Sequence, residues 1–274
     1  MEKEYLYEKC YCAYLDILGF KSFVGTGRIN VNAKKPSVIV KYLQVIKNFN
    51  DNIRQRTKQG WNSAEIKATS FSDSLIISYP VSTNPGNLFY LIMDIIYLSI
   101  DLAFLEVFVR GAITKGSLYH DDSMCFGPAL VDAYELESKN AIYPRVILDD
   151  KLIREAISIE ANSGLSGNTK EDAKMYYNLV TKIDTDGFRY IDFLSQSNEF
   201  DDGDPYIRML EKICEIVDRN VTNNDIGIKQ KYLWLKNKIN SLLSNKGLTI
   251  PLVDDSLSKE YWYRINLLRQ KLNK

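Results

Sequence analysis

The stretch from Ala13 to Phe20, Ala-Tyr-Leu-Asp-Ile-Leu-Gly-Phe, constrains the fold more than any other part of the chain. Residues 8 to 18 are apolar on both sides of the pleat, which predicts a central strand that ends at Gly19. This strand contains one carboxylate, Asp16, and burying an ionised carboxylate is costly unless a cation compensates its charge. The stretch therefore predicts a buried sheet with a functional acid at the end of a central strand.

A second stretch, Thr69–Ser78, repeats this arrangement. It predicts a hairpin of residues 66–70 and 74–79 with Asp73 at its tip. Two carboxylates at the ends of two apolar strands are the minimum needed to hold a pair of divalent metals over a nucleotide phosphate. Either aspartate taken alone can equally be a solvated turn former, and this alternative stays open.

The charge balance bears on the partners of the chain. Lys+Arg and Asp+Glu both number 35 among 274 residues, so the formal net charge is zero. No global field attracts nucleic acid or an anionic membrane, and we expect a small-molecule substrate. The hydrophobic content of 45% is ample for a packed core.

Three features predict a cytoplasmic protein without a membrane span. The most apolar run, Leu88 to Val109, contains Asp94, Asp101 and Glu106, which favours a buried helix. The opening Met1-Glu-Lys-Glu argues against a secretory signal. The four cysteines and the single histidine lack zinc-ligand spacing, so reduced thiols are expected.

The order of the predicted elements indicates an α+β sandwich with a mostly antiparallel sheet. After the first strand we expect a loop over Gly19–Gly27 and then alternating strands and helices. These are a helix over 37–58, the hairpin around Asp73, the apolar helix, a strand pair over 107–118, a helix over 129–138, a strand over 143–148 and a helix over 149–161.

The polar stretch Asn162–Glu171 is the clearest seam, and it predicts three parts. These are a core of residues 1–161, a seam with an additional hairpin packed on the core over 162–200, and a C-terminal helical extension over 201–274. The hairpin is indicated by the turn Thr185-Asp-Gly187. The C-terminal helices can cover the sheet, pack on a second copy or bind another protein, and the sequence does not decide among these.

Four sequence pieces, in this order and spacing, resemble the catalytic domain of the class III nucleotidyl cyclases over about residues 10 to 150. The closest similarity is to the bacterial pyrimidine cyclases of the Pycsar antiphage systems, which make cyclic UMP or cyclic CMP. The matching residues are Tyr14, Asp16, Ile17, Gly19 and Phe20; Asp73; Arg110, Ile113 and Gly116; and Gly127, Ala133, Leu136 and Glu137.

The resemblance implies a ferredoxin-like palm core and an enzyme that cyclises a nucleoside triphosphate. It implies a homodimer paired head to tail, with the nucleotide at the subunit interface. The product would be a second messenger for a separate effector in antiphage defence. We expect UTP as the substrate, with CTP as the second choice, although the hydroxyl of Thr69 can form a hydrogen bond with either base.

The resemblance also implies a site. Asp16 and Asp73 would bridge two Mn²⁺ or Mg²⁺ ions, with the carbonyl of Ile17 completing one ligand shell. The amides of three residues would contact the phosphates, and three side chains would lie at the nucleotide. The amides are those of Leu18, Gly19 and Phe20, and the side chains are those of Tyr14, Thr69 and Arg110.

The chain departs from the family at the base and at the transition state. Thr69 and Pro128 occupy the positions of the Lys and Asp that read a purine, so adenylate or guanylate cyclase activity is not expected. Val131 and Glu135 occupy the positions of the Asn and Arg that brace the transition state. Arg110 is the best replacement cation, and an ion pair with a neighbouring carboxylate stays open as the alternative.

Two other functions are compatible with parts of this pattern. A non-catalytic nucleotide-binding module is suggested by Val131 and Glu135. A palm-type polymerase or nuclease is opposed by the neutral charge and by the lack of a basic stripe.

Overall fold

The computed structural model describes residues 6–24, 36–58, 66–82, 84–163, 169–245 and 247–272. The chain divides into two compact units. The first runs to Ile191 without Ala103–Glu106, and the second comprises Ala103–Glu106 and the chain from Asp192 onward. The predicted division at residues 161 and 200 stays a prediction.

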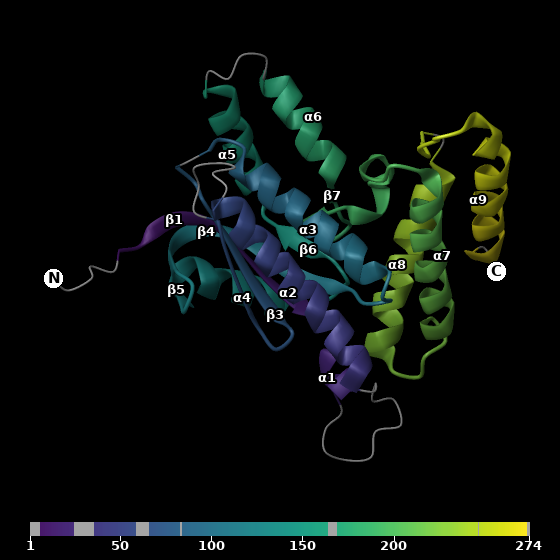
Figure 1. The fold of residues 1–274 in the computed structure, drawn as a ribbon, viewed down its shortest axis with the longest axis horizontal. Coiled ribbons are helices and arrows are strands. Elements are labelled where there is room, and N and C mark those ends of the chain that lie inside the picture. The colour runs from purple at the N-terminus through teal and green to yellow at the C-terminus, as the bar shows by residue number, and fades with distance from the viewer. Residues whose placement is uncertain are drawn as a thin grey trace. The chain divides into compact units, whose positions relative to one another are not determined.

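The first unit is built on one sheet with the strand order β2-β3-β1-β4-β6-β8-β7 (Figure 1). β1 is central and pairs antiparallel with β3 and β4, and the pairing of β4 with β6 is parallel. The predicted α+β class with a mostly antiparallel sheet is therefore confirmed. The strands are β1 (Glu8–Ile17), β2 (Lys67–Phe71), β3 (Ser74–Pro80), β4 (Val109–His120), β5 (Cys125–Phe126, paired with the end of β4), β6 (Val146–Leu148), β7 (Thr181–Ile183) and β8 (Arg189–Ile191).

One face of the sheet is covered by helices. Asn50 of α2 (Pro36–Lys58) donates a hydrogen bond to Ser70 of β2, 2.9 Å away. Tyr79 of β3 donates to Asp94 of α3 (Asn87–Ala103), and Lys115 of β4 pairs with a glutamate of α5 (Asp150–Ala161). α6 (Lys170–Val180) joins this layer through the ring contact of Tyr177 with Phe89. The side chains of β1 that face this layer are fully buried, and they form the core.

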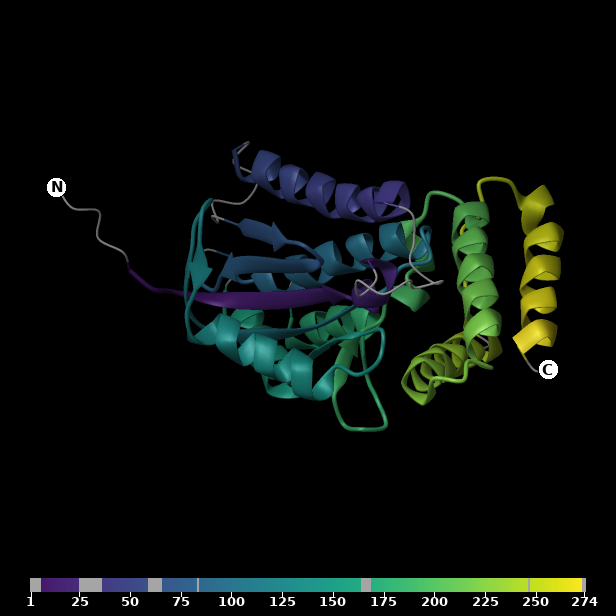
Figure 2. The ribbon, with the colours of Figure 1, turned by 90° about the horizontal axis from the view of Figure 1, so that it is seen from below.

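The opposite face carries α4 (Pro128–Asn140), which lies on the other side of β1 and β3 from α2 (Figures 1 and 2). Gly116 allows the close approach of α4, because an added Cβ would lie 3.3 Å from the Cβ of Ala129. Beyond α4 this face is more open, and Phe71 at the β2–β3 tip is 85% exposed. Asp16 belongs to this second face, since Tyr14, two residues earlier, packs edge-on against Tyr134 of α4.

The prediction of a strand pair over 107–118 is wrong, because residues 109–118 belong to one strand, β4. Gly111 and Gly116 do not make a turn within it. A Cβ at Gly111 would lie 2.5 Å from the backbone oxygen of Tyr14, so this glycine serves close packing against β1. The turn comes later, where the end of β4 pairs with β5.

Two other segments differ from the predicted elements. The described part of the predicted loop Gly19–Gly27 contains a short helix, α1 (Phe20–Val24), and residues 25–27 lie outside the described part of the chain. The predicted seam ends in α6, which was not predicted and begins at a capping box of Thr169 and Asp172.

The second unit is helical, as predicted for the end of the chain. Arg264 of α9 donates to Asp204 and Glu211 of α7, at 2.7 to 2.9 Å, and Arg219 of α7 pairs with Glu106. α7 and α9 run side by side in both views (Figures 1 and 2). The helices are η1 (Phe193–Ser195), η2 (Ser197–Glu199), α7 (Gly203–Asn220), α8 (Ile226–Ser244), η3 (Asp255–Leu257) and α9 (Ser258–Leu272). Across the described ranges no helix has both the length and the apolar character needed to cross a membrane.

Candidate active site

The structure brings Asp16 and Asp73 together. Asp16 is the penultimate residue of β1, and it pairs across the ladder with Ser74, the residue that follows Asp73. The amide of Ile17 donates to the backbone oxygen of Asp73 over 3.2 Å, which fixes the hairpin tip against the end of β1. The negative charge of Asp73 acts on the carboxyl group of Asp16.

The local sequence explains why Asp73 reaches this place. Phe71 pairs with Ser74, so Ser72 and Asp73 form a two-residue hairpin turn. Ser72 has a φ of 54°, in the left-handed region that such tight turns require. The turn directs the Asp73 backbone toward β1, and the pairing of β3 with β1 fixes the register.

The two carboxylates repel each other. Burial and the negative charge of Asp73 raise the pKa of Asp16 to about 6, and Arg110 opposes that shift. A pair of acids whose charges disfavour one another in a partly buried place is stabilised by a bound cation. The donor chemistry of this pair therefore fits a divalent metal.

Arg110 lies beside this pair. On β4, opposite Asp16, it donates from Nε and Nη2 to Oδ2 of Asp16 at 3.3 and 3.2 Å. Its Nε also lies 2.9 Å from Oε1 of Glu137, an ion pair without the alignment of a hydrogen bond. Glu137 comes from α4 and is 2% exposed. Arg110 is therefore ion-paired with Asp16 and Glu137, as the alternative interpretation predicts. Its Nη1 contacts no acceptor among the described residues.

Glu137 was not predicted as a site residue, although it stands in one of the family-like pieces of the sequence. Burial raises its pKa, and Arg110 counters that effect. The local cluster contains the three acids Asp16, Asp73 and Glu137 and the single cation Arg110. This excess of negative charge again favours a cation at the site.

The other predicted nucleotide contacts surround the two aspartates. The hydroxyl of Tyr14 lies 3.0 Å from Oγ of Ser74, on the same face as Asp16. Gly19 has a φ of 80°, a conformation that suits glycine and turns the chain from β1 into α1. The amide of Leu18 donates to the backbone oxygen of Phe108 at 2.9 Å, so this amide is used within the protein. The side chain of Phe20 is partly exposed at the start of α1.

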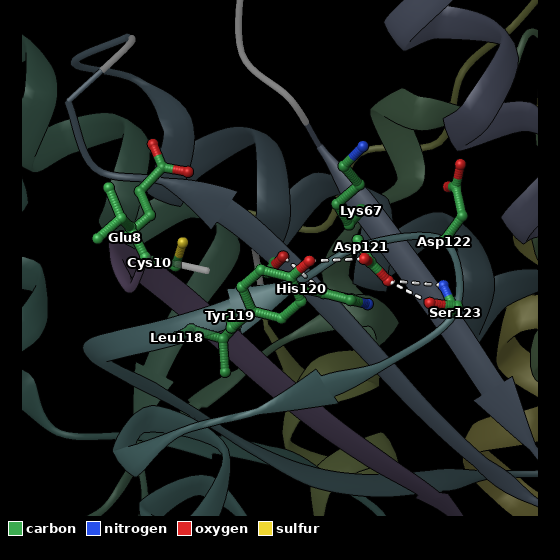
Figure 3. Close-up of a pocket in the computed structure, with 11 residues that line it drawn as sticks. Glu8, Cys10, Lys67, Leu118, Tyr119, His120, Asp121, Asp122 and Ser123 are labelled. Atoms are coloured by element: carbon green, nitrogen blue, oxygen red, sulfur yellow. Dashed lines mark hydrogen bonds between the residues drawn. The ribbon is translucent and has the colours of Figure 1, made fainter. Parts of the chain in front are cut away.

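Thr69 belongs to a separate series of hydrogen-bonded side chains on the same face. Its Oγ1 lies 2.9 Å from Nε2 of His120, and Nδ1 of His120 lies 2.8 Å from Oγ of Ser78. His120 was not predicted as a site residue, because only the bend of β4 brings it over β2 and β3. It borders a cavity of about 490 Å³, shown in Figure 3, whose lining includes Lys67, Tyr119 and Asp121.

The remaining candidates are structural or exposed. Val131 is exposed on α4, and Glu135 pairs with Lys139 at 2.6 Å on the same helix. Arg145 is 2% exposed and bound by Asp184 and Asp186, which makes it a structural residue.

No group of three or more His, Cys, Asp or Glu side chains forms a metal site within the described residues. A cation between Asp16 and Asp73 would therefore take further oxygens from the backbone, the substrate or water. The carbonyl of Ile17, next to Asp16, is the predicted backbone ligand.

The solved structures that are similar to this chain include two cyclases. The structure of a bacterial light-regulated adenylyl cyclase is 13% identical with a TM-score of 0.32, over 52% of this chain and 76% of that chain. The catalytic core of a rhodopsin-guanylyl cyclase with converted specificity, in complex with ATPαS, is 13% identical with a TM-score of 0.40. The match covers 68% of this chain and 95% of that chain. No protein-family model and no curated protein matches the chain. The functional assignment therefore depends on the site geometry.

Proposed function

We propose that this chain is a nucleotidyl cyclase that converts a pyrimidine nucleoside triphosphate into the 3′,5′-cyclic nucleotide and pyrophosphate. UTP is the preferred substrate and CTP the second. The proposal is carried by one observation, the meeting of Asp16 at the end of β1 with Asp73 in the β2–β3 turn, beside Arg110. The sequence resemblance to class III cyclases supports it independently.

The residues present fit two divalent cations, Mn²⁺ or Mg²⁺. Asp16, Asp73 and the carbonyl of Ile17 would hold them, because hard cations prefer carboxylate and carbonyl oxygens. When bound, such cations acidify the ribose 3′-hydroxyl and stabilise the charge of the departing pyrophosphate.

The chain itself orients the substrate for one substitution at phosphorus. The bond from the 3′-oxygen to the α-phosphorus forms, the bond from the α-phosphorus to the bridging oxygen breaks, and the hydroxyl proton passes to solvent. Arg110 can donate from Nη1 to a phosphate oxygen while Asp16 and Glu137 hold its other side. The amides of Gly19 and Phe20 are the predicted phosphate contacts, whereas that of Leu18 is used within the protein. Tyr14 and Thr69 lie on the same face for the nucleoside.

The test is a product assay with each of the four NTPs and Mg²⁺ or Mn²⁺, followed by mass analysis. We expect cyclic UMP as the main product, and a loss of more than about a hundredfold in Asp16→Asn and Asp73→Asn. Asp51→Asn, an exposed change on α2, is the matched control. Pyrophosphate release without a cyclic product, or equal activity in all three variants, would contradict the proposal.

A non-catalytic nucleotide-binding module is the second candidate. It is favoured by α4, where Val131 and Glu135 supply no cation to a transition state and Glu135 is paired with Lys139. Under this alternative the chain binds UTP with a divalent cation but leaves it intact, which the same assay detects when it is combined with a binding measurement.

We further propose that the enzyme works as a homodimer in the cytoplasm. Its product would act as a second messenger that a separate effector binds during antiphage defence. Support comes from the resemblance to the pyrimidine cyclases. Expression of the wild-type chain and of Asp73→Asn in phage-challenged cells, with cyclic nucleotides measured, tests this role.

A further inference from the structure

Ser78, His120 and Thr69 are joined by two hydrogen bonds, and these bonds determine which way the hydroxyl of Thr69 donates. Ser78 is 2% exposed, and its hydroxyl contacts only His120 among the described residues. A buried hydroxyl donor without an acceptor is costly, whereas an unused lone pair costs little. The hydroxyl of Ser78 therefore donates to Nδ1 of His120.

This donation selects the tautomer of His120. A neutral imidazole that accepts at Nδ1 carries its proton on Nε2. The ring is neutral at pH 7, since burial and the nearby charge of Lys67 lower the pKa of His120 to about 4. Nε2 then donates to Oγ1 of Thr69, which is 2.9 Å away.

Thr69 keeps its hydrogen and one lone pair for the substrate. Its oxygen accepts from His120, and its own hydrogen has no acceptor among the described residues. Thr69 is partly exposed on the open face of the sheet, two strands from β1 and level with Tyr14. This is a distance of roughly 10 Å across the sheet from the strand that carries Asp16, on the same face.

We propose that His120, oriented by Ser78, fixes Thr69 as a hydrogen-bond donor and so selects uracil over cytosine. The inference rests on the proposed pyrimidine cyclase function and deepens it. Uracil presents a carbonyl oxygen at C4, which accepts from Thr69. Cytosine presents an amino group there, which can use only the second lone pair of Thr69 and leaves the hydroxyl hydrogen without an acceptor on the base. His120 is a positioning residue, because it acts through Thr69.

Tautomer measurement is the first test, and it does not depend on turnover. The chain contains one histidine, so ¹⁵N-histidine labelling of the untagged full chain gives only two ring nitrogen signals. We expect Nε2 protonated and Nδ1 unprotonated at pH 7, and a mixture of tautomers in Ser78→Ala. A ring protonated at Nδ1, or a cationic ring, would overturn the inference.

The second test uses a matched pair of variants at position 120. Glutamine and glutamate have the same length, but only the amide of His120→Gln can donate to Thr69, while the carboxylate of His120→Glu accepts. The cavity beside His120 gives both side chains room to adjust. We expect wild type and His120→Gln to prefer UTP over CTP by about tenfold in kcat/KM, and His120→Glu to abolish or reverse that ratio.

The ratio of kcat/KM for UTP to that for CTP distinguishes a positioning role of His120 from a merely structural one. A structural histidine would change kcat/KM for UTP and CTP by the same factor in both variants, and that result contradicts the inference. Thr69→Val, which removes only the hydroxyl, should bring the ratio close to one. If wild type turns over no nucleotide at all, the proposed function fails, and the tautomer measurement still decides the orientation of His120.

Discussion

Glu137 and Arg110 form an ion pair beside Asp16. Glu137 is 2% exposed, so removing Arg110 leaves a buried carboxylate without its cation. We expect Arg110→Met to lose about 2 kcal/mol of unfolding free energy, less than a fully buried pair because Arg110 is partly exposed. Urea denaturation at pH 7 measures this loss.

A double-mutant cycle separates the pair from simple packing. Glu137→Gln removes the charge that Arg110 compensates, so we expect Arg110→Met to cost clearly less in the Glu137→Gln background. Additive effects of the two changes would show that the 2.9 Å contact contributes nothing to stability.

His120 makes stability depend on pH in a defined direction. Its pKa in the folded chain is lowered to about 4 by burial and by Lys67, while Asp121 and Asp122 oppose the shift. The unfolded chain therefore takes up the proton first, near pH 6.5. Stability is complete above pH 6.5 and falls as the pH is lowered toward 4.

The comparison with His120→Gln isolates this contribution. Between pH 6.5 and 4, we expect wild type to lose about 2 kcal/mol more unfolding free energy than the variant, which cannot titrate there. Equal losses in the two proteins would mean that the imidazole of the folded chain titrates normally. Chemical denaturation at several pH values supplies the data.

Site residues that lie at the ends of periodic apolar strands could be predicted from the sequence. Site residues that reach the site only through tertiary packing could not. Asp16 and Asp73 stand at the ends of apolar strands, so periodicity located both, and strand pairing brought them together. His120 is ten residues beyond Arg110 on the same strand, and only the bend of β4 brings it over Thr69. The contact of Arg110 with Glu137 likewise depends on how α4 packs, which no local signal reveals.

At the scale of elements, the predicted strand pair over 107–118 is a single strand, β4, from Val109 onward. Gly111 and Gly116 lie within this strand, and both serve close packing. A Cβ at Gly111 would lie 2.5 Å from a backbone oxygen of β1 and 2.6 Å from a side-chain carbon of Leu15. At Gly116 the nearest atom would be the Cβ of Ala129, 3.3 Å away.

These distances predict different costs for the same substitution. Gly111→Ala meets backbone that cannot move without disturbing the β1–β4 ladder, so we expect a loss of about 3 kcal/mol. Gly116→Ala needs a shift of a few tenths of an ångström by α4 and should cost about 1 kcal/mol or less. Thermal unfolding of both variants beside wild type measures the difference. Equal effects would argue against the tight β1–β4 contact.

At the scale of the whole molecule, the open face of the first unit has the composition of an interface. Phe71, Val131 and Tyr134 are exposed there, near the aspartates and Thr69. Exposed apolar side chains gathered on one face commonly mark a contact with another protein surface. The proposed homodimer would cover this face with a second copy of the chain, paired so that each site is shared.

A shared site predicts complementation between two inactive chains. Asp73→Asn removes a metal ligand, and Thr69→Arg fills the place of the base. If the metal ligands and Thr69 of one site come from different copies, a heterodimer retains one intact site of its two. Random exchange in an equal mixture should then restore about a quarter of wild-type activity.

The control keeps both changes on the same half of the site. In a mixture of Asp73→Asn and Asp16→Asn, every chain lacks one of the two metal-binding aspartates. No site then has a complete pair in any arrangement, so this mixture must stay inactive. The pair Asp73→Asn and Thr69→Arg would also stay inactive if each site lay within one chain, because every site would then carry one of the two changes. Cyclic nucleotide formation in the mixtures, measured after subunit exchange and at several dilutions, therefore decides whether the nucleotide lies between two copies or on one.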